Sequence, residues 1–141
     1  MTTDHGAIPH LTVSDASAAI DFYTKAFGAT EVARIPTPDG KRLMHAEIVL
    51  NGGRLFLVDD FPEYRAEGSE VVVAPDIAGS TSVTLHLIVP DCDKAVARAE
   101  SAGARVVMEP QDAFWGDRYA RIVDPFGHSW SLAHSLAAPA A

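Results

Sequence analysis

The sequence predicts an α+β fold of two tandem βαβββ modules, which form a concave eight-stranded mixed sheet with the helices on its outside. Three observations indicate this architecture. Short segments of period-2 alternation flank two segments with helical, amphipathic spacing. Each helical segment ends at a glycine. The two halves of the chain also repeat each other at offsets of 74 to 76 residues.

The bulk properties fit one globular domain that spans residues 1–141, because 48% of the residues are hydrophobic and 21% are charged. No apolar run reaches the roughly 18 residues of a membrane helix, and the first residues do not resemble a signal peptide. A single cysteine, Cys92, suits a reducing compartment. The net charge is −8 without a cluster of Lys or Arg, which argues against nucleic acid or a membrane as a partner. We therefore expect a cytoplasmic protein.

The first module is expected over about residues 7–60. Ser14 or Asp15 can cap a helix over 15–27, since Ala16, Ile20 and Tyr23 recur at helical spacing. Gly28 stands where a left-handed residue ends a helix. The strands of this module are expected at residues 7–13, 30–36, 42–50 and 54–59.

A linker of about residues 61–80, interrupted by Pro and Gly, leads to the second module at about residues 81–135. Asp91 caps its helix, whose apolar face includes Val96 and Ala99, and Gly103 follows it. The strands of this module are expected at residues 82–89, 105–109, 119–123 and 129–134.

The internal repeat is visible in three separate elements. The end of the first helix, Phe27-Gly28-Ala29, matches Ala102-Gly103-Ala104 at an offset of 75. Ala46-x-Ile48-Val49 matches Ala120-x-Ile122-Val123 at an offset of 74, and Val13 matches Val89 at 76. Each copy therefore reads strand–helix–strand–strand–strand, and two copies would pack side by side with an open inner surface.

These motifs resemble the vicinal oxygen chelate superfamily, which includes glyoxalase I, bleomycin resistance proteins and extradiol dioxygenases. Ala19-Ile20-Asp21-Phe22-Tyr23 is similar to its first helix. His45-Ala46-Glu47, Phe114-Trp115-Gly116-Asp117-Arg118 and Asp124-Pro125-Phe126-Gly127-His128 resemble its PhnB-like branch. The resemblance implies the fold, whereas the function stays open because this scaffold hosts isomerases, transferases, oxygenases and binding proteins.

The repeat also predicts which side chains face the concave side, because successive residues of a strand alternate between its faces. Leu11 and Val13 are expected to face the first helix. The residues expected on the concave side are Ile8, His10, His45, Glu47, Leu55, Leu57 and Asp59 in the first module and Thr84, His86, Tyr119, Arg121, Ser129 and Ser131 in the second.

In metal-dependent relatives, His, Gln or Glu from the first and last strands of each module hold the ion. The resemblance places those positions at Ile8, Leu57, Thr84 and Ser131, none of which is a usual metal ligand. No cofactor is therefore expected at the usual site.

A displaced divalent metal is the alternative. His10 and His86 are equivalent in the repeat, and with Asp59 or Glu47 they would provide two imidazoles and a carboxylate. The simpler interpretation is that each histidine is a wall residue with an ordinary hydrogen-bond partner.

Several other side chains are candidates for a site. His45 and Glu47 lie on one strand face roughly 7 Å apart and could act as general base and orienter. Arg121, beside Tyr119, could pair with Glu47 or bind an anionic ligand. Phe114 and Trp115 could stack on a planar ligand or plug the rim of the cavity.

Three functional hypotheses follow. The first is a metal-free protein that binds, and sequesters, a small aromatic or anionic molecule through His10, His45, Glu47, Leu57, His86, Phe114, Trp115, Tyr119 and Arg121. The second is a glyoxalase-like lyase, isomerase or dioxygenase with a metal at His10 and His86. The third is a metal-free enzyme that uses His45 and Glu47. A homodimer is expected, because the edge strands would otherwise stay open and the resemblance implies cavities completed across a partner.

Overall fold

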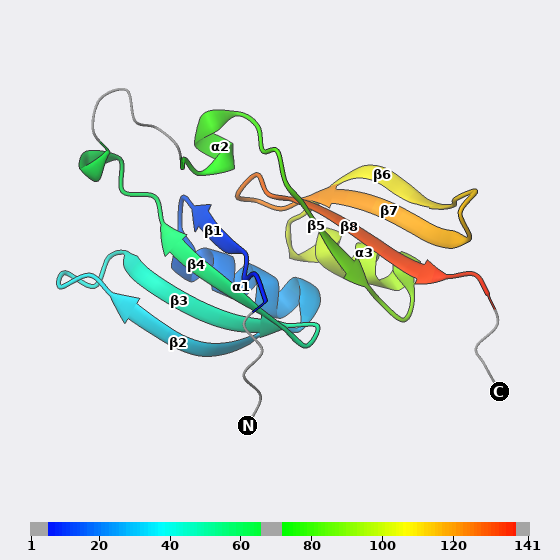
Figure 1. Ribbon diagram of the computed structural model, residues 1–141, viewed down its shortest axis with the longest axis horizontal. Coiled ribbons are helices and arrows are strands. Elements are labelled where there is room, and N and C mark those ends of the chain that lie inside the picture. Colours follow the sequence, from blue (N-terminus) through cyan, green and yellow to red (C-terminus); the bar gives the residue numbers. More distant parts are fainter. Residues whose placement is uncertain (1–5, 66–71, 138–141) are drawn as a thin grey trace.

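The structure is a computed structural model that describes residues 6–65 and 72–137, and it confirms the α+β fold with two repeated modules (Figure 1). The first module consists of β1 (His10–Val13), α1 (Ala16–Phe27), β2 (Thr30–Pro36), β3 (Leu43–Leu50) and β4 (Gly53–Asp59). The 3-10 helix η1 (Pro62–Tyr64) and the short helix α2 (Pro75–Ala78) follow. The second module consists of β5 (Thr84–Ile88), α3 (Cys92–Ala102), β6 (Arg105–Asp112), β7 (Asp117–Val123) and β8 (Ser129–Ser135).

The eight strands form two four-stranded mixed sheets rather than the single eight-stranded sheet that the sequence predicted, with the orders β1-β4-β3-β2 and β5-β8-β7-β6. In each sheet the first and last strands of the module pair in parallel, and the other pairs are antiparallel. Figure 1 shows the modules side by side, with α1 behind the first sheet and α3 behind the second. α1 and α3 also pack against each other. Each sheet therefore has one face against the helices and one open face.

Both helices begin and end where the sequence predicts. Asp15 caps α1 by accepting a hydrogen bond from the amide of Ala18, and Asp91 caps α3 in the same way from Lys94 (both 3.0 Å). Gly28 ends α1 in the left-handed region, with φ 72°. In the described part of the chain, no helix has the length and hydropathy that a membrane span requires.

The core is continuous between the two modules. Tyr23 and Phe27 of α1 stack at 6.1 Å between ring centroids, and Trp130 of β8 lies 4.8 Å from Phe27 and 5.4 Å from Tyr23. Trp130 is 1% exposed, which confirms its predicted place in the core. Burying such large aromatic rings together contributes several kcal/mol of hydrophobic stabilisation, at about 1.5–3 kcal/mol for each large side chain.

The side chains of β1, β3, β5 and β7 face as predicted. In β5, Leu87 is buried, and Thr84, His86 and Ile88 lie on the other face. Leu11, Val13, Ala46, Ile48, Ala120 and Ile122 are buried against the helices. The residues between them, which include His10, His45, Glu47, Tyr119 and Arg121, therefore lie on the open faces.

The prediction for β4 is wrong by one residue. Leu55, Leu57 and Asp59 are buried on the helix side, and Phe56 lies on the open face opposite His10 of β1. The cause is the length of the turns. Four residues separate the paired residues Val49 and Arg54, whereas five separate the equivalent pair Val123 and Ser129. An offset taken from β3 and β7 therefore slips by one residue when it is applied to β4 and β8, and a slip of one residue reverses every facing.

Several strands differ in length from the prediction, β1 and β6 among them, and the short helices η1 and α2 were not predicted. β1 begins at His10, directly after Pro9, rather than at residue 7. β6 continues to Asp112 rather than ending at residue 109. Pro110 is tolerated within it because β6 is an edge strand with an irregularity in the register between Met108 and Gln111. α2 forms inside the expected linker, of which residues 66–71 lie outside the described residues.

Candidate functional site

The open face of the first sheet carries an aromatic cluster. The ring centroids of His10 and His45 lie 5.9 Å apart, and Phe56 lies 5.7 Å from His10 and 4.7 Å from His45. All three contacts are edge to face. Burial first, and then the neighbouring His45, lowers the pKa of His10, which favours its neutral ring. These residues, together with Glu47 and Arg54, form what we call the first open face.

Glu47 on this face forms an ion pair with Arg54. Nε and Nη2 of Arg54 each donate to one carboxylate oxygen of Glu47 at 3.0 Å. The same guanidinium lies 5.3 Å from the ring centroid of Phe56. The hydrogen bonds from Arg54 lower the pKa of Glu47. His45 and Glu47 thus share a face, as predicted, but the hydrogen-bond partner of the carboxylate is Arg54.

The open face of the second sheet carries a row of rings. His86 of β5 stacks on Tyr119 of β7 with ring centroids 6.3 Å apart and 19° between the planes. Trp115 meets Tyr119 edge to face at 5.3 Å. Two hydrogen bonds hold the row, since Trp115 Nε1 donates to Asp117 (3.1 Å) and His86 Nδ1 lies 2.7 Å from Ser131 Oγ. With Arg121, the three ring residues form the second open face.

Arg121 is the cation of the second open face. Its Nη2 donates to Thr84 Oγ1 at 3.0 Å and to Ser129 Oγ at 3.4 Å. Among the described residues no carboxylate lies within ion-pair distance of Arg121. Arg121 and Glu47 occupy equivalent positions in the two modules, so the repeat places opposite charges on its two open faces. The guanidinium therefore keeps donors that an anion could engage.

Phe114 lies at the solvent-exposed end of this row of rings. It is 98% exposed and contacts Trp115 edge to face at 5.1 Å. Leu57, in contrast, is fully buried in the core, so the prediction that it contacts a ligand is wrong.

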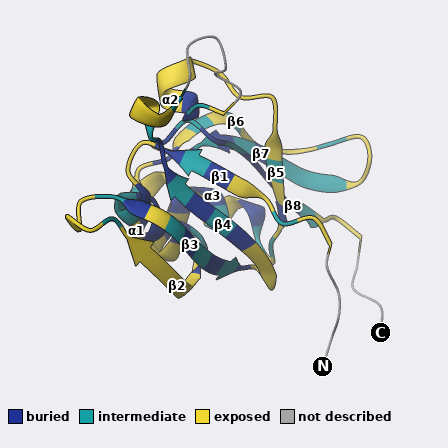
Figure 2. Ribbon diagram, turned by 60° about the vertical axis from the view of Figure 1, so that its left-hand side comes forward, coloured by how far each residue is buried: buried dark blue, intermediate teal, exposed yellow. Residues whose placement is uncertain are grey.

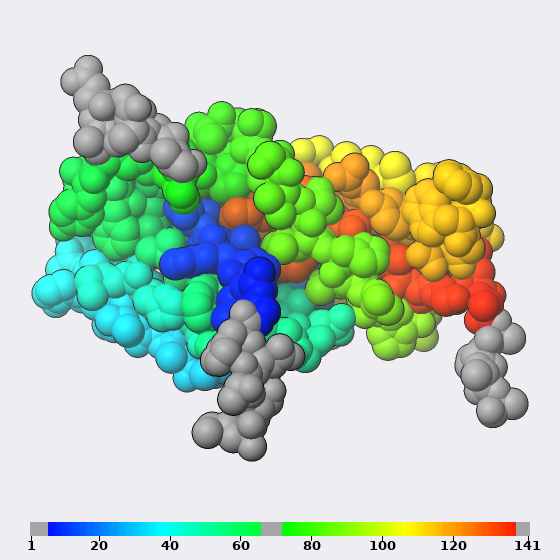
Figure 3. Space-filling view, viewed as in Figure 1, coloured from blue at the N-terminus to red at the C-terminus, as the bar shows by residue number. Residues whose placement is uncertain are grey.

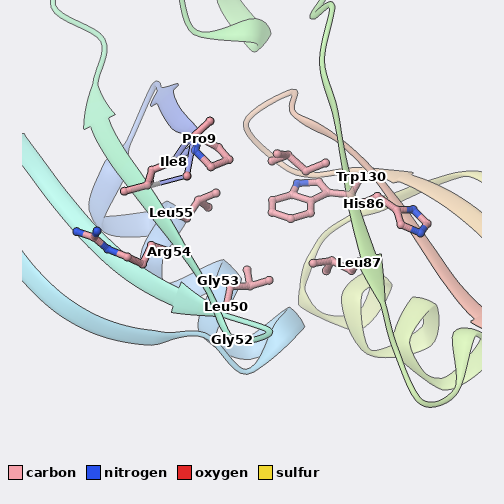
Figure 4. A pocket seen from close by; sticks show the side chains of 13 residues that line it. Ile8, Pro9, Leu50, Gly52, Gly53, Arg54, Leu55, His86, Leu87 and Trp130 are labelled. Atoms are coloured by element: carbon pink, nitrogen blue, oxygen red, sulfur yellow. The ribbon is translucent and has the colours of Figure 1, made fainter. Parts of the chain in front are cut away.

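A cavity of about 610 Å³ lies between the modules, where the N-terminal segment before β1 approaches β5 (Figure 3). Most of its lining is apolar, and Figure 4 shows the side chains that surround it. Its lining includes Ile8, Pro9, Leu50, Leu55, Leu87 and Trp130. Arg54 and His86 also line it, but Figure 4 shows that their side chains point away from it toward the open faces. The space is therefore enclosed mainly by apolar side chains from the two modules and is large enough for a small organic molecule.

The described residues do not form the displaced metal site within one chain. They contain no group of three or more His, Cys, Asp or Glu that could hold a metal ion. The prediction of Asp59 as a ligand is wrong, because its buried carboxylate accepts hydrogen bonds from the amides of Ala16 (2.9 Å) and Leu43 (2.6 Å) on the helix side.

The usual metal positions of the superfamily do not fit a metal either. The slip in β4 moves the last-strand position of the first module from Leu57 to Phe56, whose ring cannot bind an ion. The other three positions hold Ile8, Thr84 and Ser131. The donor set is therefore unsuited to a divalent ion at this place in the fold.

Arg54 and Phe56 belong to the site although the sequence patterns did not point to them. Both residues lie in β4 just after the Asn51-Gly52-Gly53 turn, and they are two residues apart, so they share a strand face. Counting the strand register from that turn would have placed Arg54 near Glu47 and Phe56 beside His10.

Comparisons with known proteins agree with this architecture. The family model described as the Glyoxalase/Bleomycin resistance protein/Dioxygenase superfamily matches residues 3–132. An uncharacterized protein of Mycobacterium bovis is 51% identical over 124 residues, which cover 88% of this chain and 79% of that protein.

Two solved structures share the fold. A PhnB protein from Bacillus cereus is 16% identical with a TM-score of 0.69, and the match covers 93% of this chain and 100% of that chain. TnmS3 from Streptomyces sp. CB03234, described as an antibiotic binding protein, is 28% identical with a TM-score of 0.64. That match covers 96% of this chain and 98% of TnmS3.

Proposed function

Because the chain belongs to the Glyoxalase/Bleomycin resistance protein/Dioxygenase superfamily, we propose that it binds a small planar anionic molecule and does so without a metal ion. The observation that carries the proposal is Arg121, a cation with no carboxylate within ion-pair distance among the described residues. It lies on the same sheet face as the rings of His86 and Tyr119. The second open face thus combines a charge and flat apolar surfaces.

The chemistry of this face suits an aromatic carboxylate or a similar anion. A guanidinium binds a carboxylate through two parallel hydrogen bonds, and the rings of Tyr119 and Trp115 provide surfaces for stacking. Trp115 and His86 are already oriented by Asp117 and Ser131, so binding requires little further ordering.

The similarity to TnmS3 supports binding rather than catalysis, since that protein is described as one that binds an antibiotic. The first open face supports the same view. Glu47, the candidate partner of His45 in acid–base chemistry, is held by Arg54 through two hydrogen bonds. We therefore propose sequestration of a small molecule as the function.

The test is a calorimetric titration with two matched probes, 2-naphthoate and its neutral analogue 2-naphthamide. Arg121→Ala should weaken binding of 2-naphthoate about tenfold and change binding of 2-naphthamide little, because only the anion uses the guanidinium. Arg105→Ala, at an exposed position of β6, is the control for a general change of charge. An equal loss of affinity for 2-naphthoate with Arg105→Ala, or no loss of affinity with Arg121→Ala, would contradict the proposal.

A metal-dependent enzyme is the competing function, because the repeat places His10 and His86 at equivalent positions on the open faces. Metal analysis of the dialysed protein decides between the two. Our proposal predicts a divalent metal content at background. A stoichiometric metal that His10→Ala and His86→Ala each remove would favour the enzyme.

We also propose that the chain forms a homodimer through its open faces. Every residue of β2 is exposed (Figure 2), including the apolar Val32 and Ile35. Val83 and Ile88 are exposed as well. Apolar side chains gathered on unpaired faces favour association. Light scattering after gel filtration should give twice the 15.0 kDa mass of one chain, and a monomer would contradict this proposal.

A further inference from the structure

A second pocket lies at the other end of the first sheet. The cavity between the modules lies where β3 ends and β4 begins, whereas this pocket of about 500 Å³ lies where β3 begins and β4 ends. The two have no lining residue in common. The turn at residues 37–40 and the helix η1 form its sides. Its apolar lining consists of Pro38, Met44, Val58, Phe61 and Tyr64.

Aromatic rings dominate this pocket. Phe61 and Tyr64 lie with ring centroids 5.8 Å apart and planes tilted by 38°. Tyr64 is 80% exposed and Met44 is 51% exposed, so both offer apolar surface that a ligand could cover. Large apolar side chains exposed together at a concave place mark a binding site more often than scattered ones do.

The cation at this pocket is already neutralised. The Arg42 guanidinium lies 4.3 Å from the ring centroid of Phe61. It donates to both carboxylate oxygens of Glu63, one of them at 3.1 Å. These hydrogen bonds lower the pKa of Glu63 to about 2. Arg42 and Glu63 therefore form an ion pair without net charge beside the Phe61 ring.

Asp39 gives the pocket a net negative charge. Its Oδ1 accepts hydrogen bonds from Thr37 Oγ1 (2.6 Å) and from the amide of Lys41 (3.0 Å). The hydrogen bond from Thr37, the first cause, and the amide of Lys41 lower the pKa of Asp39, so the carboxylate is ionised at neutral pH. Its other oxygen accepts no hydrogen bond from the described residues and remains for a ligand.

We propose that this pocket is a second ligand site, specific for a planar aromatic cation, with Phe61 and Tyr64 as stacking surfaces and Asp39 as the counter-charge. A cation is attracted both to the face of an aromatic ring and to a carboxylate. The second open face has the opposite preference, because its charged group is Arg121. The site therefore does not depend on the function proposed above.

The probe is 9-aminoacridine, a planar cation at neutral pH, followed by its fluorescence, with the planar anion 9-anthracenecarboxylate for comparison. Asp39→Asn keeps a carbonyl oxygen for the turn but removes the charge, and it should weaken binding of 9-aminoacridine about threefold. Tyr64→Ala removes an exposed ring and should weaken it about tenfold. Neither variant should change binding of 9-anthracenecarboxylate.

Two control variants test whether these losses are specific to the pocket. Glu109→Gln removes an exposed carboxylate on the second module and should leave 9-aminoacridine binding unchanged. Arg121→Ala should also leave it unchanged, while weakening the naphthoate probe. Binding that Asp39→Asn and Tyr64→Ala leave intact, or that Glu109→Gln weakens as much as Asp39→Asn does, would overturn the proposal.

Discussion

Asp124 shows how much structure one buried side chain can organise. One of its oxygens accepts from the Tyr23 hydroxyl (2.5 Å) and from Trp130 Nε1 (2.9 Å). The other accepts from the amides of Phe126 (2.9 Å) and His128 (3.0 Å). The sequence indicates only a turn at this position. Its partners could not be predicted, because Tyr23 comes from the other module, 101 residues away.

The Tyr23–Asp124 contact predicts a change of stability with pH. Burial first, and then the Asp124 carboxylate, raises the pKa of Tyr23 well above its ordinary value of 10.0. The folded chain therefore holds this proton more tightly than the unfolded chain. The free energy of unfolding contributed by Tyr23 is fully present below pH 10 and falls as the pH rises above it.

Urea unfolding from about pH 8 to about pH 11 measures this effect. Tyr23→Phe should lose about 1 kcal/mol at neutral pH, where a hydrogen bond is removed, and should show a flatter decline above pH 10. Tyr64→Phe, at an exposed ring, is the matched control and should behave like the parent protein. If the free energy of unfolding falls with pH equally for Tyr23→Phe and the parent, the folded chain does not raise the pKa of the Tyr23 hydroxyl.

At the scale of single elements, the repeat predicts most facings and fails where turn length changes. The strands β1, β3, β5 and β7 keep the alternation inferred from the sequence. β4 does not, because its facing depends on the register that the Asn51-Gly52 turn sets. The pocket around Phe61 was missed for a related reason. η1 lies in a stretch whose Pro and Gly residues give no periodic signal.

The turn before β8 also fixes an element that no pattern predicted. Gly127 has φ 87°, and a Cβ there would lie 2.7 Å from the amide nitrogen of Asp76 in α2. Asp76 in turn accepts a hydrogen bond from Ser14 Oγ (2.5 Å) at the start of the first module. α2 is therefore held between both modules by a close approach that glycine alone permits.

Gly127→Ala should destabilise the fold by about 3 kcal/mol, since it adds a clash with backbone to a left-handed conformation. Gly116→Ala is the matched control. Gly116 also has a positive φ, 98°, but a Cβ there has nothing within 4 Å, so only about 1 kcal/mol is expected. The free energy of unfolding in urea measures both values. Equal losses would mean that the contact with α2 contributes nothing.

At the scale of the whole molecule, the two modules share one core but differ on their open faces. The core is predictable because Trp130, Tyr23 and Phe27 follow helix and strand periods. The difference in charge between the two open faces could not be predicted, because it depends on which side chains form ion pairs. Glu47 is engaged by Arg54, whereas Arg121 meets only the hydroxyls of Thr84 and Ser129. The function proposed for the chain rests on this asymmetry.

The most direct test of that function is a crystal structure of the protein with 2-naphthoate, purified without a chelator. We predict that the carboxylate lies within hydrogen-bond distance of the Arg121 guanidinium and that the rings pack against Tyr119 or Trp115. No metal ion should accompany the ligand. A naphthoate bound through a metal at His10 and His86, or found only in the pocket of Phe61 and Tyr64, would contradict the proposed function.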